Sequence, residues 1–310
     1  MIRVSLVGIL AYFALLCLGA VPLAPLDVLA ALTGGGSARA VQVVWDLRLP
    51  VAIVTAVVGA SLATAGAWTS TLARNPLASP DMLGISGGAA VAVVAFPVSS
   101  FWERAGLALV GAVVCLLLLL VLGARRSVHQ LILIGVALAL FSQAAVSYLL
   151  LRADLMRATE AQVWLAGSTS FARWPVVVPL LLGLLPFLVL GLSQQRSLPI
   201  LAHDDATAIS LGVPVTRVRL LLVIAATGIV AVVVSVVGPL AFVALVAPQL
   251  ARMMGGGVLL SAIWGATLLL VCAVVAVLLP VSAPVGLLTS AIGGVMLVYL
   301  VVSRRSSWSS

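Results

Sequence analysis

Residues 47–89 read LRLPVAIVTAVVGASLATAGAWTSTLARNPLASPDMLGISGGA, and this stretch decides the fold. Residues 50–72 contain no charged side chain, and a helix needs about 20 apolar residues to cross a bilayer. Gly59, Ala63 and Ala67 recur at every fourth position, a spacing that lets neighbouring helix backbones approach closely. The stretch therefore predicts a tightly packed membrane-spanning helix, followed by a polar break at RNPLASPD.

The rest of the chain has the same character. Of 310 residues, 64% are hydrophobic and only 8% are charged, whereas soluble domains carry about 25% charged residues. We predict an all-α, polytopic membrane protein of about ten transmembrane helices, forming a single domain over residues 1–310. The expected spans are 4–23, 50–72, 83–98, 106–123, 131–151, 175–193, 218–237, 239–254, 258–279 and 285–302. The eighth is short, so we expect a half-helix packed inside the protein.

The arginines predict the orientation, because cytoplasmic loops carry an excess of basic residues. With the N-terminus inside, an even number of spans places both termini in the cytoplasm, and the larger set of arginines lies there. That set is Arg3, Arg74, Arg125, Arg126, Arg196, Arg217, Arg219, Arg252, Arg304 and Arg305. The outer set is Arg39, Arg48, Arg104, Arg152, Arg157 and Arg173. Such scattered charges indicate membrane topology and argue against nucleic acid as a partner.

The polar residues argue against an enzyme and against an ion-coupled carrier. All eight acidic residues fall in loops or at span ends, whereas an ion-coupled carrier usually keeps an ionisable group near the midplane. Backbone carbonyls that bind sodium remain an alternative. The chain has no Lys, so the Walker A phosphate loop is impossible, and no cofactor, metal or catalytic site is expected. A passive pore and a permease driven by another subunit remain open.

The segment 194–217, QQRSLPILAHDDATAISLGVPVTR, predicts a short helix outside the membrane. Asp204 is a suitable N-cap, Asp205 favours the first turn, and Gly212 suits the left-handed position that ends a helix. Its apolar residues need cover, which either a protein partner or the membrane surface could supply. Residues 203–213, with Asp204, Asp205, Ala208, Ile209, Leu211 and Gly212, are therefore the candidate contact with a driving subunit.

Several motifs resemble the permease subunits of type II ATP-binding-cassette (ABC) importers for ferric siderophores, haem and vitamin B12. The string TLARNPLASPDMLGISGGA and the stretch WLAGS are most similar to ferric-enterobactin-type permeases. The matching stretches are 47–89, LILIGVALA (131–139), WLAGS (164–168), ISLGVPVTRVRL (209–220), GPLAFVALVAPQLAR (238–252) and PVGLLTSAIGG (284–294). Together they lie in order along nearly the whole chain.

This resemblance implies a permease that carries a ferric-siderophore complex across the bacterial inner membrane, with haem or cobalamin as alternatives. It implies a second permease subunit, identical or different, two ATPase subunits and an external binding protein. It also implies that residues 203–213 are the coupling helix, that Ser127, Val128 and His129 lie near a gate, and that Arg48 helps to dock the binding protein. Val51 and Gln249 replace an Arg and a His that are usual in relatives, so docking is expected to be less electrostatic.

Overall fold

The computed structural model describes residues 1–310 except 20, 99, 124–127, 280–282 and 306–310. In the described part, the chain is helical and contains no strand. The elements are α1 (Ile2–Cys17), α2 (Pro25–Leu32), α3 (Ala38–Gln42), η1 (Val43–Arg48), α4 (Leu49–Leu72), η2 (Pro80–Leu83), α5 (Ile85–Ala95), α6 (Phe101–Gly123), α7 (Val128–Arg152), α8 (Leu155–Leu165), α9 (Trp174–Leu192), α10 (Leu198–Leu201), α11 (Asp205–Ser210), α12 (Val215–Val237), α13 (Val243–Met253), α14 (Val258–Leu278) and α15 (Val285–Arg305).

The number of apolar helices agrees with the ten expected spans. Among the described residues, six helical stretches are long and apolar enough to cross a membrane, and four shorter apolar helices accompany them. The short ones are α1, α5, α13 and the Val285–Leu300 part of α15. The half-helix expected near residue 239 is α13, which has 11 residues and is buried over most of its length. An all-α polytopic fold is therefore confirmed.

The helix α4 lies at the centre, in contact with α14, α13, α12 and α9. Its neighbours approach so closely that a side chain on Gly59 would overlap the carbonyl oxygen of Gly265 in α14. One on Gly66 would overlap the carbonyl oxygen of Ala244 in α13. In a bilayer the lipid tails are as apolar as the helices, so close van der Waals packing has to hold them together. The small residues of α4 thus provide the packing that the sequence predicts.

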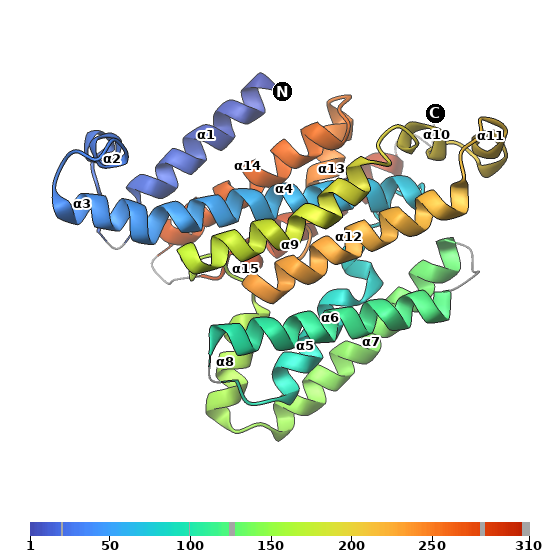
Figure 1. Ribbon diagram of the computed structural model, residues 1–310, viewed down its shortest axis with the longest axis horizontal. Helices are drawn as coiled ribbons and strands as arrows, with labels where there is room; N and C mark the ends of the chain where they lie inside the picture. Colours follow the sequence, from blue (N-terminus) through green and yellow to red (C-terminus); the bar gives the residue numbers. More distant parts are fainter. Residues whose placement is uncertain (20, 99, 124–127, 280–282, 306–310) are drawn as a thin grey trace.

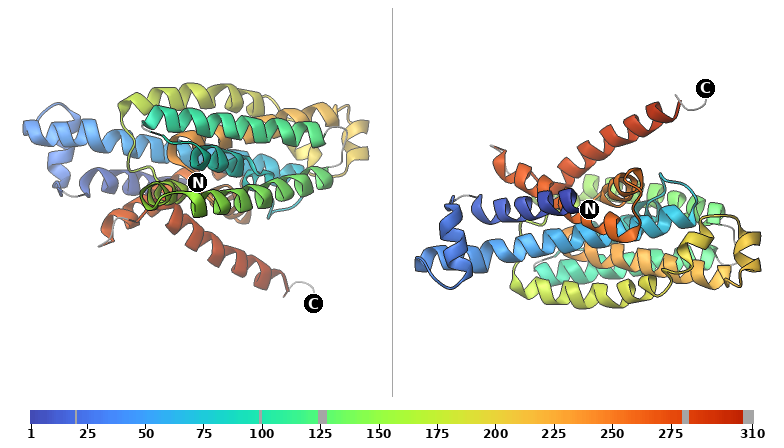
Figure 2. Two further views of the ribbon diagram at one scale, coloured as in Figure 1. Left: turned by 90° about the horizontal axis from the view of Figure 1, so that it is seen from below. Right: turned by 90° about the horizontal axis from the view of Figure 1, so that it is seen from above.

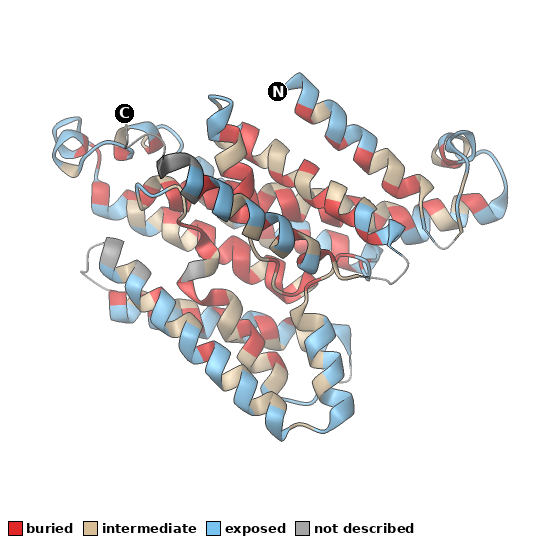
Figure 3. Cartoon of the chain, turned by 180° about the vertical axis from the view of Figure 1, so that it is seen from behind, coloured by how far each residue is buried: buried red, intermediate tan, exposed pale blue. Residues whose placement is uncertain are grey.

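The remaining helices flank α4 on different sides. Figure 1 shows α5, α6, α7 and α8 gathered on one side of α12, with α1 and α14 on the other side. It also places α2 and α3 at one end of the long axis and α10 and α11 at the other; we call these the α2 end and the α11 end. Figure 2 shows α15 leaning away from the body, and Figure 3 shows that α7 and α15 have extensive exposed faces.

Three element boundaries differ from the expectation. First, α1 ends at Cys17 rather than near residue 23, because Leu18 has an extended backbone (ψ 154°). Second, the helix that contains α4 begins at Ala38 and runs through η1, whose π-helical winding directly before Pro50 accommodates the N–H that proline lacks. Third, α8 was not expected, although Asp154 caps it by accepting the Arg157 N–H at 2.9 Å.

We predict that Gly59→Ala destabilises the chain, whereas Gly106→Ala does not. At Gly59 the new methyl group meets the backbone of α14, and overpacking of this kind costs about 1–3 kcal/mol. At Gly106 in α6 nothing lies within 4 Å of the added carbon, and the higher helix propensity of Ala contributes about 0.5–1 kcal/mol. Thermal unfolding in detergent measures both. Equal melting temperatures for the two variants would contradict the close contact between α4 and α14.

Candidate functional site

The segment 203–213 contains a helix that is closed at both ends. The Asp204 carboxylate accepts the Thr207 N–H at 2.8 Å and the Thr207 hydroxyl at 2.6 Å. At the other end Gly212 has φ +79°, and its N–H donates to the Ile209 carbonyl at 2.9 Å. The Val213 N–H donates to the Ala208 carbonyl at 3.0 Å, which completes a Schellman motif. The cap at Asp204 and the left-handed Gly212 both lie where the sequence predicts them.

Asp205 ties α11 to the ends of two membrane helices. Its carboxylate binds Arg74 Nη2 at 2.5 Å and Arg219 Nη2 at 2.6 Å, and its second oxygen accepts from Arg219 Nη1 at 2.9 Å. Arg74 directly follows α4 and also donates from Nε to the Leu201 carbonyl at 3.1 Å, while Arg219 belongs to the first turns of α12. The sequence pattern indicates neither pair, because Arg74 is 131 residues from Asp205 and Arg219 lies 14 residues away on the next membrane helix.

These contacts keep the Asp205 carboxylate charged. Hydrogen bonds from Arg219, and then from Arg74, hold the pKa of Asp205 below its usual value. A depressed pKa means that the ion pairs stabilise the fold at neutral pH, and that this contribution is lost only when the pH falls through the low folded value. The α11 anchor is therefore intact throughout the physiological range.

A second set of bonds joins the end of α13 to the loop after α4. Arg252 donates from Nη1 to the Ser70 hydroxyl at 2.7 Å, and from Nη2 to Gln249 Oε1 at 3.1 Å and the Pro76 carbonyl at 3.3 Å. Gln249 thus accepts a hydrogen bond from the arginine one turn later. Through Arg74 and Arg252, α11, α12 and α13 are all fastened to the same end of α4.

The exposed face of this assembly is apolar. The side chains of Ile209 and Leu211 are 64% and 63% exposed, whereas Ala208 is completely buried. Ala208 therefore packs inside the chain, and its part in coupling stays a prediction. A six-residue helix is too short for the sequence pattern to show which apolar face packs inward. The surface formed by Ile209 and Leu211, which we call the α11 patch, remains open to a partner.

The short helix η2 carries an unusual carboxyl group. The Oδ2 oxygen of Asp81 is buried and has no hydrogen-bond partner among the described residues, although Asp81 as a whole is only half-buried. Burial raises the pKa of Asp81 to about 7. The short helix η2 packs against α7, α12, α5 and α4, so this group lies between four helices near the α11 end.

The predicted gate falls largely outside the described residues. Ser127 lies outside them, and so do the side chains of Val128 and His129. The backbone shows only that α7 begins at Val128, so the gate assignment stays a prediction.

Arg48 is 9% exposed, so it is buried rather than displayed to a docking protein. Its Nη1 donates to the Leu16 carbonyl at 2.6 Å, and its Nη2 donates to the Val21 carbonyl. The guanidinium thus satisfies backbone groups where α1 ends, and fastens that turn to η1. In this conformation Arg48 has a structural role, and its use in docking stays a prediction that the geometry does not favour.

These features together define a multi-pass membrane permease. Among the described residues, no group of three or more His, Cys, Asp or Glu side chains could hold a metal ion. The chain belongs to the FecCD transport family, whose model matches residues 6–303. This confirms the resemblance that the motifs indicate.

Relatives and a solved structure agree with this family. The chain is 35% identical over 297 residues to the ferric enterobactin transport system permease protein FepG of Escherichia coli (strain K12), covering 92% of this chain and 90% of the relative. It is 34% identical over 315 residues to the vitamin B12 import system permease protein BtuC of Salmonella paratyphi A, covering 97% and 94%. Its fold matches an inward-facing metal-chelate type ABC transporter with a TM-score of 0.85 and 26% identity, covering 97% and 98%.

We predict that Asp81→Asn stabilises the chain more at pH 8 than at pH 5. Because burial raises the pKa of Asp81, the folded state holds its proton up to about pH 7, while an unfolded Asp loses it near pH 4. Stability therefore falls as the pH rises from about 4 to about 7, and the neutral amide avoids this loss. Melting temperatures at the two pH values measure the effect, with the exposed Asp27→Asn as control. A wild-type stability independent of pH in this window would contradict the buried carboxyl.

Proposed function

We propose that this chain is the permease subunit of an ABC importer, and that it carries a ferric-siderophore complex inward using ATP that a separate subunit hydrolyses. The observation that carries the proposal is the α11 patch on a helix anchored to α4 and α12. The side chains of Ile209 and Leu211 are apolar and mostly exposed, and they lie outside the apolar spans that lipid would cover. Their exposure to water would be unfavourable without a partner. A groove in an ATPase subunit would cover them.

The anchors explain how such a subunit could move the membrane domain. A displacement of α11 acts on Asp205, which passes it through Arg74 to α4 and through Arg219 to α12. Asp204 and Gly212 make α11 rigid enough to transmit the movement instead of unwinding. Because α4 contacts α9, α12, α13 and α14, a shift at its end would reach a large part of the bundle.

The same proposal includes the remaining partners. A second permease subunit, identical or different, would cover the exposed apolar side chains of α15, which include Val295 and Val298. An external binding protein would deliver the ligand at the α2 end, and the α11 end with both termini would lie in the cytoplasm of a bacterium. The siderophore is preferred because the motifs most resemble enterobactin-type permeases. Haem and cobalamin are alternatives, and ion-coupled transport is a weaker one.

We predict that Leu211→Arg uncouples ATP hydrolysis from transport. A charged side chain in an apolar groove would be buried without a partner, which is strongly unfavourable. Transport and ligand-stimulated ATPase activity of the reconstituted complex should therefore fall together, by about tenfold or more, while membrane insertion is unchanged. Ala202→Arg, which adds the same charge at an exposed position just before the capped segment, is the control. Full coupling in Leu211→Arg would mean that the α11 patch does not contact the ATPase subunit.

We predict that a strain lacking this chain loses uptake of a radiolabelled ferric siderophore but keeps cobalamin uptake. In proteoliposomes of the whole complex, ionophores should leave uptake intact while ATP is present, because the acidic residues lie outside the expected apolar spans. If the strain lost cobalamin uptake alone, the transported ligand would be cobalamin, and the class of importer would be the same. Uptake that ionophores abolish at constant ATP would instead establish an ion-coupled carrier.

A further inference from the structure

A large groove lies away from the α11 patch, where the loop before α6, the helix α8 and the last turn of α12 meet. Its volume is about 1130 Å³. Most of its lining is apolar, and aromatic and β-branched side chains such as Phe101, Val163, Trp164, Phe171 and Val236 contribute to it. A groove of this size and character between membrane helices is suited to hydrocarbon chains.

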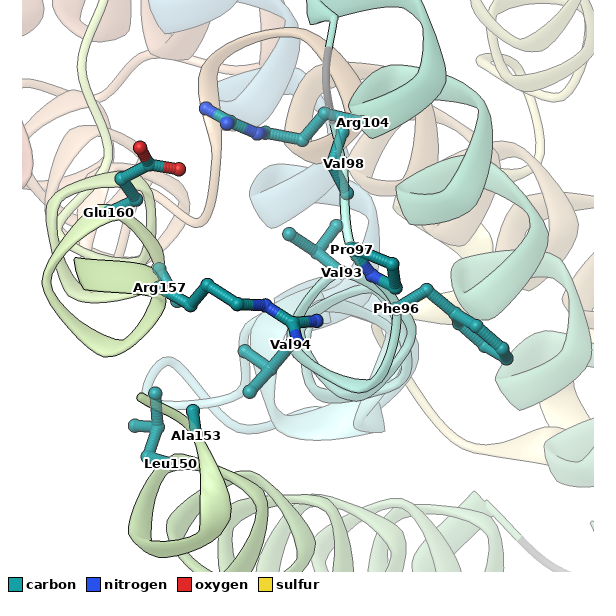
Figure 4. Close-up of a pocket in the computed structure, with 11 residues that line it drawn as sticks. Val93, Val94, Phe96, Pro97, Val98, Arg104, Leu150, Ala153, Arg157 and Glu160 are labelled. Atoms are coloured by element: carbon teal, nitrogen blue, oxygen red, sulfur yellow. The ribbon is translucent and has the colours of Figure 1, made fainter. Parts of the chain in front are cut away.

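One end of the groove is polar. Arg104 from α6 and Glu160 from α8 line both the groove and a neighbouring cavity of about 140 Å³. Figure 4 shows the two side chains extending from opposite walls into the space between their helices, with Arg157 beside them. No hydrogen bond or ion pair joins the Arg104 guanidinium or the Glu160 carboxylate to another described residue. A cation and an anion therefore face the same space without satisfying each other.

The surroundings of Arg104 place it at the level of a membrane interface. The neighbouring Trp102 is 52% exposed and packs edge-to-face on Phe101 with ring centroids 5.2 Å apart. Exposed Trp side chains are enriched where the hydrocarbon meets the headgroups. A capping box fixes the start of α6, since the Ser100 N–H donates to Glu103 Oε2 at 3.2 Å and the Glu103 N–H donates to Ser100 Oγ at 3.2 Å. Arg104 is thus held at the depth of lipid headgroups.

We propose that this groove binds one phospholipid with a primary ammonium headgroup, of the phosphatidylethanolamine type. Its acyl chains would lie along Val163, Trp164 and Val236, its phosphate would bind Arg104, and its ammonium group would donate to Glu160. Arg157 lines only the neighbouring cavity, so the groove itself pairs the Arg104 cation with the Glu160 anion, which matches a zwitterion. A phosphatidylglycerol headgroup brings nothing positive to Glu160, and a choline headgroup has no N–H to donate. This inference requires only that the chain lies in a membrane, so it is independent of the transported substrate.

The test is native mass spectrometry of the full-length chain, purified in detergent, delipidated and then mixed with phosphatidylethanolamine, phosphatidylcholine or phosphatidylglycerol of identical acyl chains. We expect phosphatidylethanolamine to be retained several-fold more than the other two. Arg104→Gln should lower retention of all three, because the phosphate loses its partner. Glu160→Gln should remove only the preference for ethanolamine over choline. Arg152→Gln is the control, since Arg152 lies over the Tyr148 ring and lines neither cavity.

Two further measurements separate lost binding from lost folding. Arg104→Lys keeps a phosphate-binding charge and should keep retention, so equal losses in the Lys and Gln variants would overturn the assignment. Phosphatidylethanolamine brominated in its acyl chains should quench Trp164, and the Trp164→Phe variant should lose that part of the quenching. Equal retention of the three lipids by the unaltered chain would overturn the proposal. So would displacement of the lipid by a ferric siderophore, because the groove would then belong to the transported ligand.

Discussion

The rest of the structure depends on the crossing of α4 and α14, where the backbones of Gly59 and Gly265 meet. In a bilayer this contact substitutes for the hydrophobic effect, which cannot drive one apolar helix onto another when lipid is equally apolar. The same face of α4 continues to Gly66, which lies against Ala244 of α13. A single stripe of small residues thus fixes two neighbours of the central helix. The helices α9 and α12 also pack on α4, so their positions depend on it as well.

The two ends of the central helix α4 make different kinds of contact. At the α2 end, the helix continues backward through η1 and holds Arg48, whose guanidinium donates to the Leu16 carbonyl in the last turn of α1 and to the Val21 carbonyl just beyond it. At the α11 end it stops at Leu72, and the next residues supply Arg74 to Asp205. Ser70 in its last turn receives Arg252 from α13. At the α2 end, the contacts of α4 are all with the neighbouring segments just described. At the α11 end, α11, α12 and α13 meet α4 beside a surface that still has exposed apolar residues.

The features that can be predicted from the sequence are those whose physical cause is local. The stripe of Gly59, Ala63 and Ala67, the cap at Asp204 and the left-handed Gly212 each follow from neighbouring residues, and the structure contains all three. The features that depend on tertiary contacts cannot be predicted in this way. Arg74 and Asp205 are 131 residues apart, and nothing in the sequence pairs them. Ala208 and Arg48 were expected at contact surfaces, but both are buried, because burial depends on helices that a linear pattern does not position.

The small size of α11 links its order to its proposed task. An isolated helix of six residues is unstable in water, since nucleation costs more than its few hydrogen bonds return. Its order therefore depends on the Asp204 cap, the Schellman closure at Gly212 and the Asp205 ion pairs. The first two hold the helix together, and the third joins it to the ends of α4 and α12. In the proposed mechanism, a partner that pushes on Ile209 and Leu211 would act on this third contact. The carboxylate that helps to keep α11 in place is thus also a group through which movement of α11 would reach the membrane helices.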